Sequence, residues 1–227
     1  LTDTARVLDL QPNAIQNEGL LEASANNGPL QLIKGTVTND TSFGGGMLNV
    51  VAGGKLSVGG GGNVGVIGGS VDNQGTLELN TKDNPQMTHT FDGVDVDSAS
   101  GASILVNGSR PGNTNSGPTG VIWSLVNATT VDSAGSMFVD AEAVVEIDET
   151  STLSILPNGT LTVDDGANDE DGIGGLIDVM IDDAAPLGEW RISWAGDNTA
   201  TLDGWLGDGR LTYTYGGSET IGTWYDA

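Results

Sequence analysis

Apolar and polar residues alternate along many short segments of the chain, and several of these segments begin at a glycine. The shortest shared pattern is Gly-x-Leu-x-apolar, which occurs with Leu or Met at Gly19, Gly46, Gly54, Gly75, Gly135, Gly159 and Gly209. Alternation with a period of two predicts a half-buried β-strand, here entered through a turn. The spacing is uneven, and we interpret the pattern as an imperfect repeat of about 20 to 25 residues.

A longer version of the pattern occurs twice, as NEGLLEA at residues 17–23 and as NQGTLEL at residues 73–79. Asn and Gly tolerate the backbone conformations that tight corners need. We therefore expect Asn17, Asn39 and Asn73 at corners of the chain, where stacked Asn side chains could bond to one another in a ladder. The alternative is that these residues are ordinary turn residues facing solvent.

Composition supports an all-β fold. Gly contributes 36 of 227 residues, 37% of the chain is hydrophobic, and the aromatic residues are five Trp, three Tyr and three Phe. No long segment has apolar residues at helical spacing. Thin layers of Val, Leu and Ile suit a stack of coils better than one thick core, so we predict a parallel β-solenoid. A β-sandwich or jelly roll is the alternative.

The segment from Ile15 to Leu79 contains IQNEGLLEA, LQLIKGTVTN, GGGMLNVVAGGKLSVGGGG and GGSVDNQGTLEL. It resembles the Gly/Asn-rich β-helical repeats of large bacterial exported proteins, including filamentous-haemagglutinin-like and autotransporter-type adhesins. The likeness returns faintly at residues 153–165. It implies a right-handed parallel β-helix on the outside of a cell, and it implies no catalytic residue.

Charge narrows the choice of partners. The chain has 31 acidic and 7 basic residues and a formal net charge of −24, which argues against nucleic acid or anionic lipid as a partner. It has no Cys, hence no disulfides. No apolar run approaches the roughly twenty residues of a membrane span, and no signal peptide is visible. Because the chain begins at Leu1, we expect processing of a longer precursor, with an extracellular or cell-surface location.

An acidic run, DDGANDEDG at residues 164–172, is the candidate metal site. Its spacing matches neither an EF-hand nor the Gly-Gly-x-Gly-x-Asp repeat of calcium-binding β-rolls. Crowded oxygen ligands on a turn nevertheless suit Ca²⁺, and a solvated acidic loop is the alternative. The predicted ligands are Asp164, Asp165, Asn168, Asp169 and Asp171.

Four Asn-x-Ser/Thr sequons make this protein a candidate glycoprotein. All four lie in segments that resemble turns. The candidate glycosylation sites are Asn39, Asn107, Asn127 and Asn158.

The chain divides into a predicted solenoid at residues 1–183, with a polar surface loop at 107–120, and an aromatic-rich β segment at 184–227. The aromatic segment could cap the solenoid, contact another subunit or bind sugar rings. An apolar strand near the N-terminus could likewise pair with a neighbouring copy. The predicted assembly residues are Val7, Leu8, Leu10, Trp190, Trp194, Trp205, Tyr213, Tyr215 and Trp224.

Catalytic motifs are few. The chain has one histidine, His89, no Cys and no Gly-x-Ser-x-Gly motif, which argues against common nucleophilic and zinc chemistries. We therefore predict a non-enzymatic extracellular structural protein, the subunit of a self-assembling filament or surface adhesin. Its expected partners are copies of itself, joined head to tail, and a cell-surface polysaccharide. The alternative function is that of a β-helix protein that binds or cleaves polysaccharide.

Overall fold

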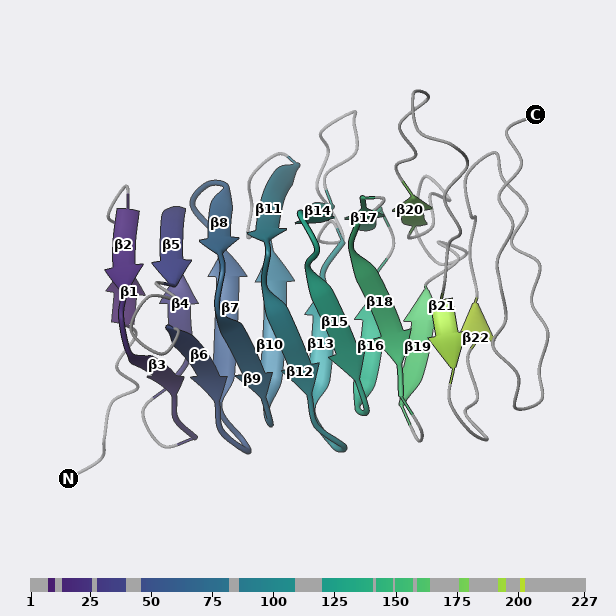
Figure 1. Cartoon of the computed structure of the whole chain (residues 1–227), viewed down its shortest axis with the longest axis horizontal. Coiled ribbons are helices and arrows are strands. Elements are labelled where there is room, and N and C mark those ends of the chain that lie inside the picture. The colour runs from purple at the N-terminus through teal and green to yellow at the C-terminus, as the bar shows by residue number, and fades with distance from the viewer. Residues whose placement is uncertain are drawn as a thin grey trace.

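The computed structural model describes residues 8–10, 14–25, 28–39, 46–81, 86–108, 120–140, 142–148, 150–156, 159–163, 176–179, 192–194 and 201–202. The described residues form β-strands joined by short turns, without any helix. The strands are arranged in three parallel sheets that run along the length of the molecule (Figure 1).

Sheet I contains eight strands, and its inward residues are mainly Leu, Ile and Val. In order they are β1 (Leu8–Leu10), β4 (Leu30–Leu32), β7 (Lys55–Gly59), β10 (Thr76–Asn80), β13 (Ser103–Val106), β16 (Ser136–Val139), β19 (Thr160–Val163) and β22 (Thr201–Leu202).

Sheet II contains seven strands and includes the largest buried side chains. They are β2 (Ala14–Asn17), β5 (Gly35–Asn39), β8 (Val64–Ile67), β11 (Met87–Asp92), β14 (Val121–Val126), β17 (Val144–Ile147) and β20 (Leu176–Val179).

Sheet III also contains seven strands, and most of them lie in front in Figure 1. They are β3 (Leu20–Ala23), β6 (Met47–Val50), β9 (Ser70–Asn73), β12 (Asp95–Ser98), β15 (Thr130–Ser133), β18 (Thr152–Ile155) and β21 (Ile192–Trp194).

The order of strands within each sheet defines a solenoid. Every strand pairs in parallel with the strand three later in the chain, so each coil gives one strand to each sheet. The predicted parallel β-solenoid is therefore confirmed. The alternative of a β-sandwich or jelly roll is wrong, because those folds are built from antiparallel pairs and the pairings between described strands are all parallel.

Glycines of the short repeat lie at corners where successive coils come into close contact. A Cβ atom on Gly75 would collide with the backbone oxygen of Gly54 in the preceding coil, and one on Gly135 would collide with that of Ala102. The Gly54 oxygen accepts a hydrogen bond from the Thr76 N–H at 3.0 Å. Missing side chains therefore allow the backbones of neighbouring coils to approach within hydrogen-bonding distance.

The core is a set of columns in which equivalent inward side chains stack from coil to coil. In sheet I, Leu56, Leu77 and Ile104 are paired in successive strands and fully buried. In sheet II the column widens to hold Phe91 and Trp123, whose rings meet edge to face with centroids 5.3 Å apart. Alternating strands place every second residue in these columns, which is why the sequence shows a period of two.

The length of a coil varies more than the predicted repeat. Leu56 pairs with Leu77, 21 residues further on, but Ile104 pairs with Met137, 33 residues further on. The longer coil includes the predicted polar loop. Its two ends meet, because the Val121 N–H donates to the Asn107 oxygen at 3.1 Å, and residues 109–119 between them lie outside the described residues. A constant period of 20 to 25 residues is therefore wrong for this part of the chain.

The predicted boundary near residue 183 falls between described strands. After it, β21 pairs with β18 and β22 pairs with β19, so both add to sheets that began earlier in the chain. The remainder of the aromatic-rich segment lies outside the described residues, and its role as a cap or assembly segment stays a prediction.

Candidate functional site

The two similar segments NEGLLEA and NQGTLEL form the same kind of corner. The Oδ1 atom of Asn17 accepts from the Gly19 N–H at 3.1 Å, and its Nδ2 donates to the Met47 oxygen in the next coil at 3.2 Å. Asn73 repeats both bonds, with Gly75 at 3.2 Å and the Ser103 oxygen at 3.0 Å. The first corner joins sheets II and III and the second joins sheets III and I, so one local solution serves two edges of the solenoid.

The Asn ladder forms between two of the three predicted residues. The Asn17 Nδ2 atom donates to Oδ1 of Asn39 at 2.9 Å, since the two residues are paired in sheet II. Asn73 ends a strand of sheet III and donates instead to Oγ of Ser98 at 3.0 Å. All three Asn side chains are buried, so the alternative of solvent-facing turn residues is wrong. Each bond links neighbouring coils and stabilises their stacking.

The predicted sequons differ in their surroundings. Asn39 is buried and its Nδ2 atom, which would carry a sugar, donates to the Gly68 oxygen at 2.9 Å. Asn127 is exposed, and Asn107 is partly exposed. Asn158 lies outside the described residues. A sugar on Asn39 would have to replace a bond in the core, so Asn107 and Asn127 are the better placed of the described sequons.

A left-handed corner surrounds Asn127. Asn127 and Ala128 have φ angles of 54° and 61°. The Asn127 N–H donates to Oδ2 of Asp148 at 2.7 Å, and the Ala128 N–H donates to Oγ1 of Thr150 at 2.8 Å. Burial alone would raise the pKa of Asp148, but hydrogen bonds from Ser151, Asn127 and Thr150 lower it below the usual value. The carboxylate therefore fixes a corner that its backbone conformation alone would disfavour.

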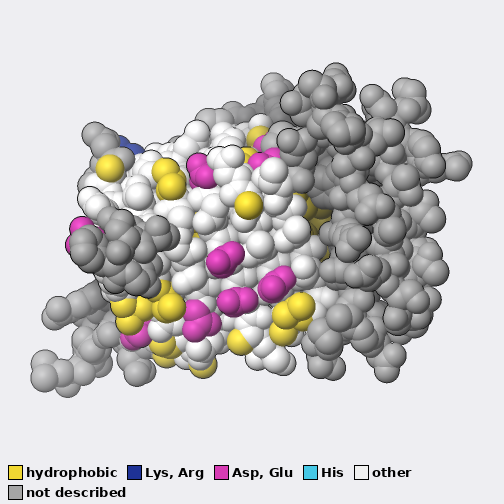
Figure 2. All heavy atoms as spheres, viewed as in Figure 1, with side chains coloured by type: hydrophobic (Ala, Val, Ile, Leu, Met, Phe, Trp, Pro, Cys, Tyr) yellow, Lys and Arg dark blue, Asp and Glu magenta, His cyan; other side chains and the backbone are white. Residues whose placement is uncertain are grey.

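A row of acidic and amide side chains crosses the outer face of sheet III. Glu22, Asn49, Asp72, Asp97 and Asp132 are paired one after another in adjacent strands. Acidic side chains gather on this face in the space-filling view (Figure 2). Paired residues of neighbouring strands are close enough to interact directly, so the three aspartates repel one another.

Asp97, in the middle of this row, has a raised pKa. The largest cause is burial by its neighbours, followed by the charges of Asp132, Asp95 and Asp72. Because the pKa in the folded state lies above the ordinary 3.8, ionisation of Asp97 is less favourable in the folded chain than in the unfolded chain. Its contribution therefore becomes unfavourable to stability as the pH rises from about 4 upward.

Replacing Asp97 by Asn should consequently stabilise the protein at pH 7, by about 0.5 kcal/mol, because like charges in adjacent strands destabilise by amounts of this order. Urea unfolding at low ionic strength would measure it. The gain should shrink in 1 M salt, where screening is strong. A variant that is less stable than the wild type at low salt would mean that Asp97 makes a favourable contact outweighing the repulsion.

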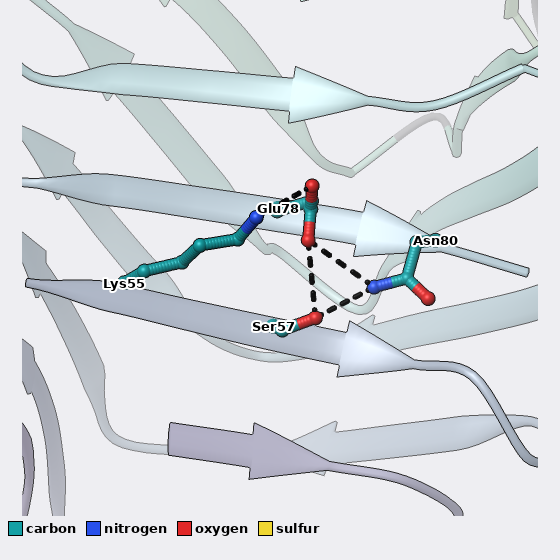
Figure 3. Close-up of polar contacts among 4 residues, drawn as sticks. All are labelled: Lys55, Ser57, Glu78 and Asn80. Carbon is teal, nitrogen blue, oxygen red and sulfur yellow. Dashed lines mark hydrogen bonds and ion pairs between the residues drawn. The ribbon is translucent and has the colours of Figure 1, made fainter. Parts of the chain in front are cut away.

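A polar cluster links β7 and β10 on the outer face of sheet I (Figure 3). The Lys55 Nζ atom lies 2.8 Å from Oε1 of Glu78, whose Oε2 accepts from the Ser57 hydroxyl at 3.1 Å. The Asn80 Nδ2 atom donates to the same hydroxyl oxygen at 2.6 Å. Ser57 is buried, so this hydroxyl is poorly placed to meet a substrate. We interpret the cluster as a structural link between coils.

His89 lies inside the solenoid. It is fully buried in sheet II, where it pairs with Val64 on one side and Trp123 on the other. Its Nδ1 atom accepts from the Val64 N–H at 3.2 Å, and its Nε2 atom lies 3.0 Å from the Asn80 oxygen. A bond to each nitrogen requires the neutral ring with its proton on Nε2. Burial lowers the pKa of His89, against a smaller opposing effect of the Asn80 bond.

Most of the predicted site residues lie outside the described residues. This holds for the calcium ligands Asp164, Asp165, Asn168, Asp169 and Asp171 and for the assembly residues Val7, Trp190, Trp205, Tyr213, Tyr215 and Trp224. The backbone of Trp194 belongs to β21, and Leu8 and Leu10 belong to β1. Calcium binding and assembly therefore stay predictions at these positions.

In the part of the chain that the structure describes, no three or more His, Cys, Asp or Glu side chains are grouped in a way that could hold a metal ion. The same part has no helix that is long and apolar enough to cross a membrane.

Sequence reasoning missed the acidic row on sheet III and the polar cluster on sheet I. Asp72, Asp97 and Asp132 are spaced 25 and then 35 residues apart, so no fixed period relates them. Their common signal is local: each follows a buried Val at the same place in its strand, as in Val71, Val96 and Val131.

The architecture defines this molecule as a parallel β-solenoid protein with three sheets, polar ladders on its corners and an acidic outer face. No protein-family model matches the chain, and comparison with curated proteins and with solved structures found no match.

Proposed function

We propose that this protein is an extracellular structural subunit that assembles head to tail into a filament or a surface adhesin. The observation that supports the proposal is the position of β1, β2 and β3. Each is the terminal strand of its sheet and pairs with one other described strand. Such edge strands are templates for pairing with another chain.

The contact would join unlike surfaces. The first coil of one copy would meet the last coil of the next, where β20, β21 and β22 are the terminal described strands of the same three sheets. An interface between unlike surfaces does not close on itself, and it generates a linear filament unless the rotation between copies forms a ring. Parallel pairing across it would continue the order that already exists within the chain.

The position of β1 refines the predicted role of the N-terminal segment. Leu8 to Leu10 pair with Leu30 to Leu32 of the same chain. In the proposed filament, β1 therefore presents the outer edge of sheet I to the next copy while remaining part of its own sheet.

Charge should control the assembly. Each copy carries a net charge of −24, so two copies repel one another at low ionic strength. Salt screens this repulsion over a Debye length of about 10 Å at 0.1 M. Sedimentation velocity of the purified full chain should therefore show larger species as salt concentration rises from 10 to about 500 mM. A size distribution that is independent of salt would contradict an assembly limited by charge.

Deletion of residues 1–11 tests the edge directly. The truncated chain lacks β1 and should keep its β circular dichroism spectrum, but fail to polymerise in conditions where the full chain does. Leu20→Lys is the matched control, because Leu20 lies on the outer face of sheet III and is 56% exposed. This variant should still assemble. The proposal is wrong if the truncated chain forms fibres, or if the full chain is monomeric at every concentration and salt condition.

A further inference from the structure

His89 is the only histidine of the chain, and it connects three successive strands of the core. Its ring pairs in register with Val64 of β8 and Trp123 of β14. It also fills the space beside Gly59 of β7, where a Cβ atom would collide with the ring and with the Asn80 oxygen. The sequence thus leaves room for one imidazole at the point where β7, β8, β10 and β11 meet.

Both ring nitrogens are used, and in opposite senses. Nδ1 accepts a hydrogen bond from the Val64 N–H at 3.2 Å, and the Nε2 proton is directed to the Asn80 oxygen at 3.0 Å. Addition of a second proton would turn Nδ1 into a donor. It would then face the Val64 N–H, which is also a donor, inside a core that is closed to water.

No described charged side chain faces the ring to compensate for a positive charge. The inward residues of the strands packed against it are apolar: Val58, Val64, Val66, Leu79, Phe91, Trp123 and Leu125. Lys55, Glu78 and Asp92, the charged residues of β7, β10 and β11, belong to the outer faces of their sheets. A buried imidazolium without a partner is strongly disfavoured.

We propose that His89 is an acid-sensitive latch: protonation of its ring breaks the bond to Val64 and opens the stack of coils around β8 and β11. The device is independent of the proposed assembly, since every contact lies within one chain. At neutral pH the ring holds the coils together, and mild acid releases them.

The direction of the effect follows from the lowered pKa of His89, which burial causes. A histidine that stays neutral in the folded state contributes full stability above its ordinary pKa of 6.5, and this contribution is lost as the pH falls below that value. The unfolding equilibrium constant should therefore rise about tenfold between pH 7.5 and pH 5.5.

Urea unfolding of the full chain at these two pH values, at constant ionic strength, tests the proposal. His89→Gln is the comparison, because Gln keeps one donor and one acceptor but does not titrate. The tenfold rise should be present in the wild type and absent from the variant, whose carboxylates are the same. Equal pH dependence in the two proteins would overturn the proposal.

A second measurement needs no variant. In wild-type protein labelled with ¹⁵N-histidine, the single ring should report an unprotonated Nδ1 atom in the folded state at every pH at which the fold persists. Hydrogen exchange at the Val64 amide should accelerate as the pH falls below 6.5, relative to the intrinsic rate. A ring that titrates near pH 6.5 while the Val64 amide stays protected would overturn the latch, even if the variant fails to fold.

Discussion

Replacing Trp123 by Ala should lower the free energy of unfolding by about 3 to 5 kcal/mol, the range for removing a large aromatic side chain from a core. Trp123 is fully buried in the middle of sheet II and meets the edge of Phe91. In a solenoid each coil contacts only its neighbours, so a cavity there separates the two halves of the stack. Urea unfolding would measure the loss.

Two variants sharpen this prediction. Trp123→Phe keeps an aromatic ring and removes an indole N–H for which the described residues offer no hydrogen-bond partner; we expect it to lose clearly less stability than the Ala variant. Ile122→Ala changes the outward neighbour on the same strand and should cost under about 1 kcal/mol. If the Ala variants at 122 and 123 lose equal stability, the assignment of inward and outward faces in β14 is wrong.

Replacing Gly59 by Ala should be the second severe change, at about 3 kcal/mol of lost stability. Gly59 has a φ of +102°, where a residue with a Cβ atom is strained by roughly 1 to 3 kcal/mol. Its new methyl group would also collide with His89 and with the backbone oxygen of Asn80, which forces a shift in a packed core.

Matched glycines separate these two causes. Gly101 has a φ of +86° with nothing within 4 Å of the position that a methyl group would take, and Gly19 has open space without a positive φ. Thermal or urea unfolding should place Gly101→Ala near 1 kcal/mol and Gly19→Ala within about 0.5 kcal/mol of the wild type. A Gly59→Ala variant no worse than Gly101→Ala would mean that the His89 ring does not fill this space.

The fold class could be predicted because the strands carry their own signal. Leu56, Leu77 and Leu161 each follow the glycine of a Gly-x-Leu-x-apolar unit, and each is a buried residue of sheet I. The same unit also starts β3 and β6 of sheet III, at Gly19 and Gly46. One pattern therefore marks two different sheets.

The period of the solenoid could not be derived from that pattern. Strands of sheet II lack the glycine unit: β11 is MTHTFD and β14 is VIWSLV. Coils also lengthen wherever a corner carries extra residues, as between Asn107 and Val121. Long excursions leave the parallel pairing intact, since loop closure becomes only slowly less favourable with length.

The corner asparagines show the same limit at the level of single residues. Asn17, Asn39 and Asn73 were distinguishable as corner residues, because few other residues suit such turns. Their assignment to columns depends on which strand each one ends. Asn17 and Asn39 end strands of sheet II and bond to each other, whereas Asn73 ends a strand of sheet III and bonds to Ser98. Local sequence alone does not carry that information.

X-ray fibre diffraction from aligned filaments of the full chain is the sharpest test of head-to-tail stacking. Neighbouring strands of a sheet lie about 4.8 Å apart, and in this solenoid they follow one another along its length. Stacking of the last coil of one copy on the first coil of the next predicts a strong reflection near 4.8 Å along the filament axis. A reflection at about 4.8 Å perpendicular to that axis would mean that the solenoids associate side by side, and would contradict head-to-tail assembly.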